Sequence, residues 1–405
     1  MKLDDTLLKK YAQVMVLYAL NDGKGINKGD TVFLVGQEYT KDLFMAIAKE
    51  IYAAGGNLIT NYQPNNLREN SLARFLLQNG NDEQIAFFAT PYWKGIVEAT
   101  DHILFIISEP DIQYLADIPS SKISLMNSAR APYMKMREKK EQEGKLSWSL
   151  CLYGTQSMAD EAGLSLEEYW EQIIEACYLR EDDPVSKWKT VQQEIEQFKD
   201  KLDALQIETL HIKGSDVDLH VQIGENRKWL SGGGKNIPSF EIFTSPDWRG
   251  TNGFINFNQP LYYSGKRISG VSLAFKNGVV IASSATENED ALTEMIAQEN
   301  ADKVGEFSLT DKRHSRITKF MATTLFDENM GGDYGNTHIA LGNAYKDTFT
   351  GDMSAVSDEQ WAAMGYNSCP KVHTDIISTS DRVVTAKLRN GTERVIYKNG
   401  QFELE

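Results

Sequence analysis

The first half of the chain alternates short apolar runs with stretches in which apolar residues recur every three or four positions. That spacing predicts helices over residues 7–20 and 41–54, and the apolar runs at 31–36, 58–62 and 102–107 predict buried strands. Strands that alternate with helices are typical of an α/β sheet with largely parallel strands. No G-x-G-x-x-G follows the first predicted strand, so this half is interpreted as a scaffold without a dinucleotide.

The end of this half is marked by helices and a proline. Residues 133–145 are rich in charge and predict a helix with a solvated face. Ser165 and Glu168 have the spacing of a capping box, which predicts the start of another helix. Pro184 interrupts the helical pattern, and a long amphipathic helix is predicted over 188–205. We therefore place a domain boundary near this proline.

In the second half, apolar residues alternate with polar ones, a pattern that predicts strands with one buried face. The alternating apolar residues are Leu210, Ile212, Val217, Leu219, Val221 and Ile223. Asn-Gly pairs at 277–278, 390–391 and 399–400 are typical of tight hairpin turns. We predict an α/β N-terminal domain over residues 1–185 and a mainly β (α+β) C-terminal domain over residues 186–405.

Composition narrows the possible partners and compartments. The formal charge of −15 argues against a nucleic-acid partner, because phosphate binding relies on Lys and Arg. No apolar run approaches the roughly 18 residues of a membrane span, and the N-terminus lacks the form of a signal peptide. The three cysteines are far apart and odd in number, which favours a reducing compartment without disulfides. We therefore expect a cytoplasmic protein with no membrane partner.

Histidine and carboxylate residues gather between residues 305 and 375. His373 and Asp375 are two positions apart in a strand-like run, so both side chains point to the same face. His338 and Glu306 lie on nearby apolar segments. Grouped carboxylates repel each other unless a cation cancels the charge, and His with Asp or Glu suits zinc, cobalt or manganese. The pattern raises the hypothesis of a metal site.

Simpler interpretations of these residues remain open. A lone His-x-Asp is more often a surface pair than a ligand pair, and the residues alone support the two readings about equally. His314 lies in a charged run and is expected at the surface, whereas His102 is expected to be a hydrogen-bonded core histidine. Cys369 lies four residues before His373. A Cys–His nucleophilic pair is conceivable there, but a core or loop cysteine is favoured.

A phosphate loop and a serine nucleophile are disfavoured. The glycine-rich run 231–236 lacks the Walker pattern, because Trp229 stands where the first glycine belongs and Asn236 replaces the Ser or Thr. Ser239 and Ser245 have no histidine nearby in the sequence.

Five sequence blocks occur in a fixed order along the second half. They are Asn236-Ile237-Pro238-Ser239-Phe240-Glu241-Ile242-Phe243-Thr244-Ser245-Pro246, Gly305-Glu306-Phe307, Leu325-Phe326-Asp327-Glu328-Asn329, His338-Ile339-Ala340-Leu341-Gly342 ending in Tyr345, and His373-Thr374-Asp375. In this order they resemble the aminopeptidase T family of metallo-aminopeptidases, which includes aminopeptidase S. The helix start at 162–169 is similar to the same family, so the resemblance covers most of the chain.

The resemblance implies a metal-dependent aminopeptidase that hydrolyses the N-terminal peptide bond of peptides. It makes the C-terminal domain the catalytic one and implies two divalent metal ions, with zinc, cobalt and manganese left open. The implied metal ligands are Glu241, Glu306, Glu328, His338, His373 and Asp375. Glu306 and Tyr345 are the implied catalytic residues, with Tyr345 placed to hydrogen-bond the oxyanion. Which glutamate bridges the metals and which is the base stays open, and a homodimer is implied.

The chain departs from the family pattern in two places. Phe240 stands where a glycine is expected before the first glutamate, and the link over 330–337 is longer than usual. These departures concern the substrate pocket and specificity more than the chemistry. The alternatives are another two-metal hydrolase, either a phosphoesterase or an amidohydrolase, and a catalytically silent metal-binding scaffold.

Overall fold

The computed structural model describes residues 3–404 and divides the chain into two compact units. The first, called here the α/β unit, comprises residues 1–190 with 233–238, and the second, the β-rich unit, comprises 191–232 with 239–405. The division between them falls inside one long helix. The domains predicted from the sequence, residues 1–185 and 186–405, stay a prediction, because they concern which segments fold and work independently.

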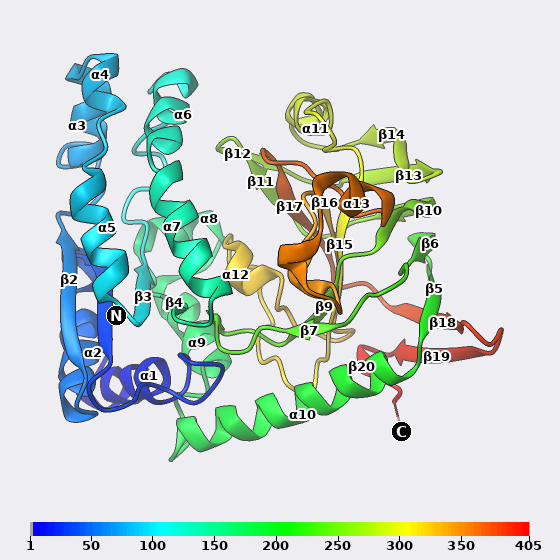
Figure 1. The fold of residues 1–405 in the computed structure, drawn as a ribbon, viewed down its shortest axis with the longest axis horizontal. Helices are drawn as coiled ribbons and strands as arrows, with labels where there is room; N and C mark the ends of the chain where they lie inside the picture. The colour runs from blue at the N-terminus through cyan, green and yellow to red at the C-terminus, as the bar shows by residue number, and fades with distance from the viewer. Residues whose placement is uncertain (1–2, 405) are drawn as a thin grey trace. The chain divides into compact units, whose positions relative to one another are not determined.

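The α/β unit contains a five-stranded sheet in the order β2-β1-β3-β4-β8 (Figure 1). Its strands are β1 (Thr31–Gln37), β2 (Asn57–Gln63), β3 (His102–Ile107), β4 (Ser147–Leu152) and β8 (Asn236–Ile237). Every pairing in it is parallel. Parallel neighbours require crossover connections, which helices supply here. Val32, Phe33 and Leu34 are buried in succession, as expected for a strand covered on both faces.

Helices occupy most of the remaining chain of this unit. They are α1 (Asp5–Leu17), α2 (Lys41–Ala53), α3 (Leu72–Asn79), α4 (Asp82–Ile85), α5 (Thr90–Ala99), α6 (Ser120–Ala129), α7 (Ala131–Gln142), α8 (Gln156–Glu161), α9 (Leu166–Ala176), the 3-10 turn η1 (Glu38–Thr40) and the start of α10 (Pro184–Ala204). The capping box at Ser165 and Glu168 is confirmed. Pro184 is the first residue of α10, a position that tolerates proline. It therefore starts a helix as well as interrupting the helical pattern before it.

The β-rich unit is built from two antiparallel sheets and a small hairpin. The eight-stranded sheet has the order β14-β13-β10-β6-β5-β18-β19-β20, the five-stranded sheet the order β17-β16-β15-β9-β7, and β11 pairs with β12. The strands are β5 (Ile207–Gly214), β6 (Val217–Gln222), β7 (Leu230–Ser231), β9 (Glu241–Thr244), β10 (Asp247–Asn256), β11 (Leu261–Tyr263), β12 (Lys266–Ile268), β13 (Ser272–Lys276), β14 (Val279–Ser284), β15 (Val304–Thr310), β16 (Asn336–Gly342), β17 (His373–Ser378), β18 (Arg382–Leu388), β19 (Glu393–Lys398) and β20 (Gln401–Phe402).

Short helices complete this unit. Besides the end of α10 they are α11 (Glu289–Ile296), α12 (Thr324–Asp327), α13 (Asp358–Ala363), η2 (Lys346–Thr348) and η3 (Met353–Ala355). The three Asn-Gly turns join β13 to β14, β18 to β19 and β19 to β20, as predicted. The predicted fold class, an α/β part followed by a mainly β part, is confirmed. Within residues 3–404, no helix combines the length and apolarity needed to cross a bilayer.

Arg382 joins the two large sheets of the β-rich unit. It lies on β18 and is 1% exposed. Its guanidinium donates to the Asp216 carboxylate at 3.0 Å, the Asn256 carbonyl at 2.5 Å and the Thr337 hydroxyl, on β16, at 2.8 Å. A buried charge is stable only when such partners replace the water it has lost.

We expect Arg382→Met to lower the free energy of unfolding by about 3–5 kcal/mol, because it leaves Asp216 without its buried partner. Lys387→Met on the same strand is the matched control, since the Lys387–Glu208 pair is half-exposed on both sides. That change should cost less than about 1 kcal/mol. Urea unfolding of the two variants measures both values, and equal small losses would show that Arg382 does not stabilise the packing of the sheets.

Candidate metal centre

In the five-stranded sheet of the β-rich unit, adjacent strands bring five of the predicted residues to one face. Ser308 pairs with His338 across β15 and β16, and Ala340 pairs with Asp375 across β16 and β17. Residues directly opposite each other, and residues two apart on one strand, share a face. The residues placed together by this register are Glu241 on β9, Glu306 on β15, His338 on β16, and His373 and Asp375 on β17.

The donor atoms of these side chains form two groups. His338 Nε2 lies 3.4 Å from Glu241 Oε2 and 3.6 Å from Glu306 Oε1. His373 Nε2 lies 3.3 Å from Glu306 Oε2 and 3.7 Å from Asp375 Oδ1. Within each group the donor atoms are all within 4.8 Å of one another. Glu306 belongs to both groups, and its two carboxylate oxygens face different histidines.

Burial and mutual charge shift the pKa values across the cluster. Burial raises the pKa of Glu241 and of Asp375. Burial also acts on Glu306, but hydrogen bonds with His338 and His373 outweigh it and lower the pKa of that carboxyl to about 2. Desolvation would lower the pKa of His373, but Glu306 and Asp375 raise that pKa to about 9. The carboxylates likewise raise the pKa of His338 well above its ordinary value. The cluster therefore favours positive charge between its carboxylates.

The donor set fits divalent metal ions. Glu306 and Glu241 are 3% and 8% exposed, and the ion pairs found for them in residues 3–404 are with the two histidines. Both imidazoles approach the carboxylates through Nε2, one of the two ring nitrogens that can ligate a metal. His373 Nδ1 donates to the Asn343 carbonyl at 2.8 Å, the second hydrogen bond that usually orients such a ligand. Imidazole and carboxylate donors together suit zinc, cobalt or manganese.

Glu328 lies directly after α12 and belongs to neither three-donor group. Burial raises its pKa well above the ordinary value, and the charges of Glu241 and Asp375 raise it further. Its carboxyl therefore lies within electrostatic reach of the cluster. Asn329 Nδ2 donates to Glu328 Oε1 at 3.2 Å, and Asn336 Nδ2 donates to the Glu328 carbonyl at 2.9 Å. The long link before His338 is thus tied down next to Glu328.

Tyr345 covers one side of the cluster. Its ring lies 4.6 Å from the His373 ring and 5.6 Å from the Phe243 ring, measured between centroids. Desolvation of the hydroxyl, followed by the charges of Glu306 and Asp375, raises the pKa of Tyr345 well above its ordinary value. The residue remains 41% exposed overall. The phenol therefore keeps its proton as a hydrogen-bond donor at an accessible edge of the cluster.

Two supporting residues were missed by the sequence analysis. Ser308 donates to Glu241 Oε2 at 2.9 Å, and the Asn343 carbonyl orients His373. Ser308 was findable, because it lies two positions after Glu306 on the same strand and therefore on the same face. The role of Asn343 depends on its backbone oxygen, which leaves no sequence signal.

Phe240 does not distort the backbone at the start of the site. It is 1% exposed, and its N–H donates to Asn329 Oδ1 at 2.6 Å. Phe240 is not among the non-glycine residues with positive φ in the described chain, so its backbone conformation does not require a glycine. The departure noted in the sequence therefore places an aromatic side chain in the core.

The expectation for His314 was wrong and that for His102 is confirmed. His314 is 6% exposed, with Nε2 2.9 Å from a carboxylate oxygen of Glu194 and its ring against Phe198 on α10. The charged run around it is folded against that helix, which local composition does not reveal. His102 is buried between Ser147 and Asp30, with both ring nitrogens in hydrogen bonds.

Known proteins match this chain over nearly its whole length. A family model described as "Thermophilic metalloprotease (M29)" matches residues 4–402. Aminopeptidase AmpS of Bacillus subtilis is 27% identical over 421 aligned residues, and aminopeptidase T of Thermus thermophilus is 25% identical over 415, each alignment covering 98% of both chains. The solved structure of wild-type AmpT from Thermus thermophilus matches with a TM-score of 0.81 at 22% identity, covering 98% of this chain and 99% of that one.

Proposed function

The chain belongs to the thermophilic metalloprotease (M29) family, and we propose that it is an aminopeptidase acting through the centre described above. Membership of this family confirms the resemblance found in the sequence and makes the protein a metal-dependent peptidase. The relatives named above are aminopeptidases, which supports removal of the N-terminal residue as the activity. Release of the chromophore from a leucine anilide, lost on chelation and regained with metal, tests this proposal.

The main support for a two-metal centre is the position of Glu306. One of its oxygens faces His338 and Glu241, and the other faces His373 and Asp375. A carboxylate in this position could serve two cations, one held with His338 and Glu241 and the other with His373 and Asp375. When bound, two such ions would supply Lewis-acid chemistry that activates a water and polarises the scissile carbonyl. Glu306 would thus be the ligand that the two sites have in common rather than the base.

The proton acceptor in this proposal is Glu328. A base must lie near the ions without being fully used as a ligand, and Glu328 interacts with the charges of the cluster while belonging to neither three-donor group. It takes the proton from water and passes it to the leaving amine. Tyr345, still protonated, donates a hydrogen bond to the oxyanion.

Glu328→Gln is expected to lower kcat by about 10²–10⁴-fold, the usual contribution of general acid–base catalysis. The amide keeps the shape of the side chain but cannot take a proton, and neither metal loses a ligand. Metal content measured by mass spectrometry should therefore match the unmodified protein. A variant that loses metal would show instead that Glu328 is a ligand, as the sequence resemblance implied.

We also propose that the protein is a homodimer, on the resemblance to its family. Light scattering at working concentrations should give about twice the chain mass of 45.6 kDa. A monomer mass together with full activity would contradict the dimer.

The cysteines support a reducing compartment, in line with a cytoplasmic protein. Cys151, Cys177 and Cys369 are buried free thiols. Proteins of oxidising compartments more often join such residues in disulfides.

A further inference from the structure

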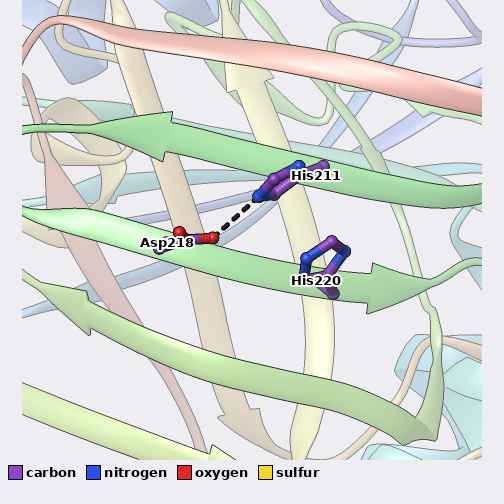
Figure 2. A group of neighbouring side chains, drawn as sticks. All are labelled: His211, Asp218 and His220. Atoms are coloured by element: carbon purple, nitrogen blue, oxygen red, sulfur yellow. Dashed lines mark hydrogen bonds and ion pairs between the residues drawn. The ribbon is translucent and has the colours of Figure 1, made fainter. Parts of the chain in front are cut away.

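A second group of possible metal ligands lies on the eight-stranded sheet. It consists of His211 on β5 and Asp218 and His220 on β6, drawn in Figure 2. One donor atom from each residue lies within 4.8 Å of the others. His211 Nε2 is 2.7 Å from Asp218 Oδ1, and the two imidazole rings are stacked with centroids 3.9 Å apart. None of these residues belongs to the centre around Glu306.

The strand register brings the three side chains together. His211 pairs directly with His220 across β5 and β6. Asp218 lies two positions before His220, so it shares the face of the two histidines. Leu219, between them, is buried, and Asp218 and His220 are exposed. The ligand atoms therefore point away from the core, on backbone positions fixed by the central strands of the sheet.

The charges around the group favour the ligand forms of its members. The hydrogen bond from His211 lowers the pKa of Asp218, with smaller contributions from Lys213 and His220, so the carboxyl stays ionised. Desolvation and then the neighbouring His211 lower the pKa of His220, and a neutral imidazole offers a lone pair. Lys213 pairs with Asp218 across the strands, and its exposed, flexible side chain can turn away from an incoming cation.

We propose that His211, Asp218 and His220 form a further metal site that takes one late first-row divalent cation, with Zn²⁺ as the best fit. Two imidazoles and one carboxylate are the donors such ions prefer, whereas Mg²⁺ and Ca²⁺ prefer all-oxygen sites. Three protein ligands leave a position for water. Because the ligands come from two adjacent strands and point away from the core, we assign the site a structural role, tying β5 to β6.

Binding requires only side-chain rotation. Zinc–nitrogen bonds are about 2.0–2.1 Å long, so donors within 4.8 Å of each other can close around one ion. The ion takes the place of the hydrogen now shared by His211 and Asp218, and the His220 ring turns from its stacked position to present a nitrogen. The ion then joins β5 to β6. Because the unfolded chain does not hold the three donors together, the bound ion stabilises the fold.

The test compares metal content in the full chain, purified without a polyhistidine tag, with that of a variant carrying His211→Asn and His220→Asn. Both proteins are stripped with chelator, dialysed against buffered Zn²⁺ and analysed for bound zinc. The expected difference is one equivalent per chain, whatever the total. Asn252→Ala is the matched control, because Asn252 pairs with His220 on the adjacent strand but is not a proposed ligand. It should retain the additional zinc.

A second measurement follows stability. Zn²⁺ added to the stripped protein should raise the Tm more in the unmodified chain than in the double variant, while the Tm in chelator and leucine-anilide turnover of the reloaded proteins stay alike. Asp218→Asn should lower the zinc affinity of the additional site. The loss should be about 10–100-fold or more, the range typical when a supporting residue of a metal site is changed. Equal zinc content and equal Tm responses would overturn the proposal. Because the readout is a difference of one equivalent, it holds even if the Glu306 centre proves not to bind metal.

Discussion

In the proposed two-metal centre, Glu306→Gln is expected to lose both ions and to lower kcat/KM by about 10⁴-fold or more, the scale seen when residues that act as one catalytic unit are removed. The reason is geometric. The two carboxylate oxygens of Glu306 face His338 and His373, so this one side chain serves both three-donor groups. A neutral amide offers one weakly coordinating oxygen and removes the charge between the cations.

His373→Ala is the informative comparison for this variant. His373 belongs to one three-donor group only, so its loss should remove one ion and leave the other with Glu241, Glu306 and His338. Metal analysis after dialysis distinguishes the two outcomes. Circular dichroism of both variants checks that they remain folded, so that loss of metal reports the missing ligand. Retention of both ions in Glu306→Gln would rule out a bridging role.

Acetylation of a peptide substrate at its N-terminus is expected to lower kcat/KM by about 10–150-fold. A free α-amino group has a pKa of roughly 7.7–8.0, so near neutral pH both the ammonium and the neutral amine are present. A carboxylate of the cluster can hold the ammonium by a charge-assisted hydrogen bond, or the neutral amine can ligate a metal. Loss of a hydrogen bond to a charged group costs about 1.5–3 kcal/mol, and here it is lost in the transition state.

The comparison uses a leucine-initiated peptide and its acetylated twin, followed by mass spectrometry over time. The free peptide should lose residues one at a time from its N-terminus, and the acetylated peptide should stay intact. Because either contact with the amine would hold the first peptide bond at the activated water, the second peptide bond should lie out of reach. Equal cleavage of the two peptides, or internal fragments from either, would show an endopeptidase or another amidohydrolase.

Periodicity and turn chemistry were enough to predict most of the fold. The alternation from Leu210 to Ile223 gave β5 and β6, because one buried face imposes a period of two on the sequence. The same argument placed His373 and Asp375 on one face of a strand, and in β17 their side chains lie 3.7 Å apart between Nε2 and Oδ1. These inferences depend only on neighbours along the chain, which the sequence states directly.

Features that depend on pairing between distant strands could not be predicted. The shared position of Glu306 follows from the register of β15 on β16, which shifts between Val304 and Glu306. No local pattern specifies that irregularity. The burial of His314 against α10 likewise depends on a helix more than 100 residues earlier in the chain. The cross-strand pair of His211 with His220 was missed for the same reason, although both lie in predicted strands.

The most direct test of a two-metal aminopeptidase is a titration of the stripped protein with Zn²⁺ or Co²⁺, with bound metal and leucine-anilide hydrolysis measured in the same samples. The protein should carry His211→Asn and His220→Asn so that only the centre around Glu306 contributes. A two-metal aminopeptidase should show no turnover without metal and full turnover when two equivalents are bound. Full turnover in the metal-free protein, or saturation of activity at a single equivalent, would contradict it.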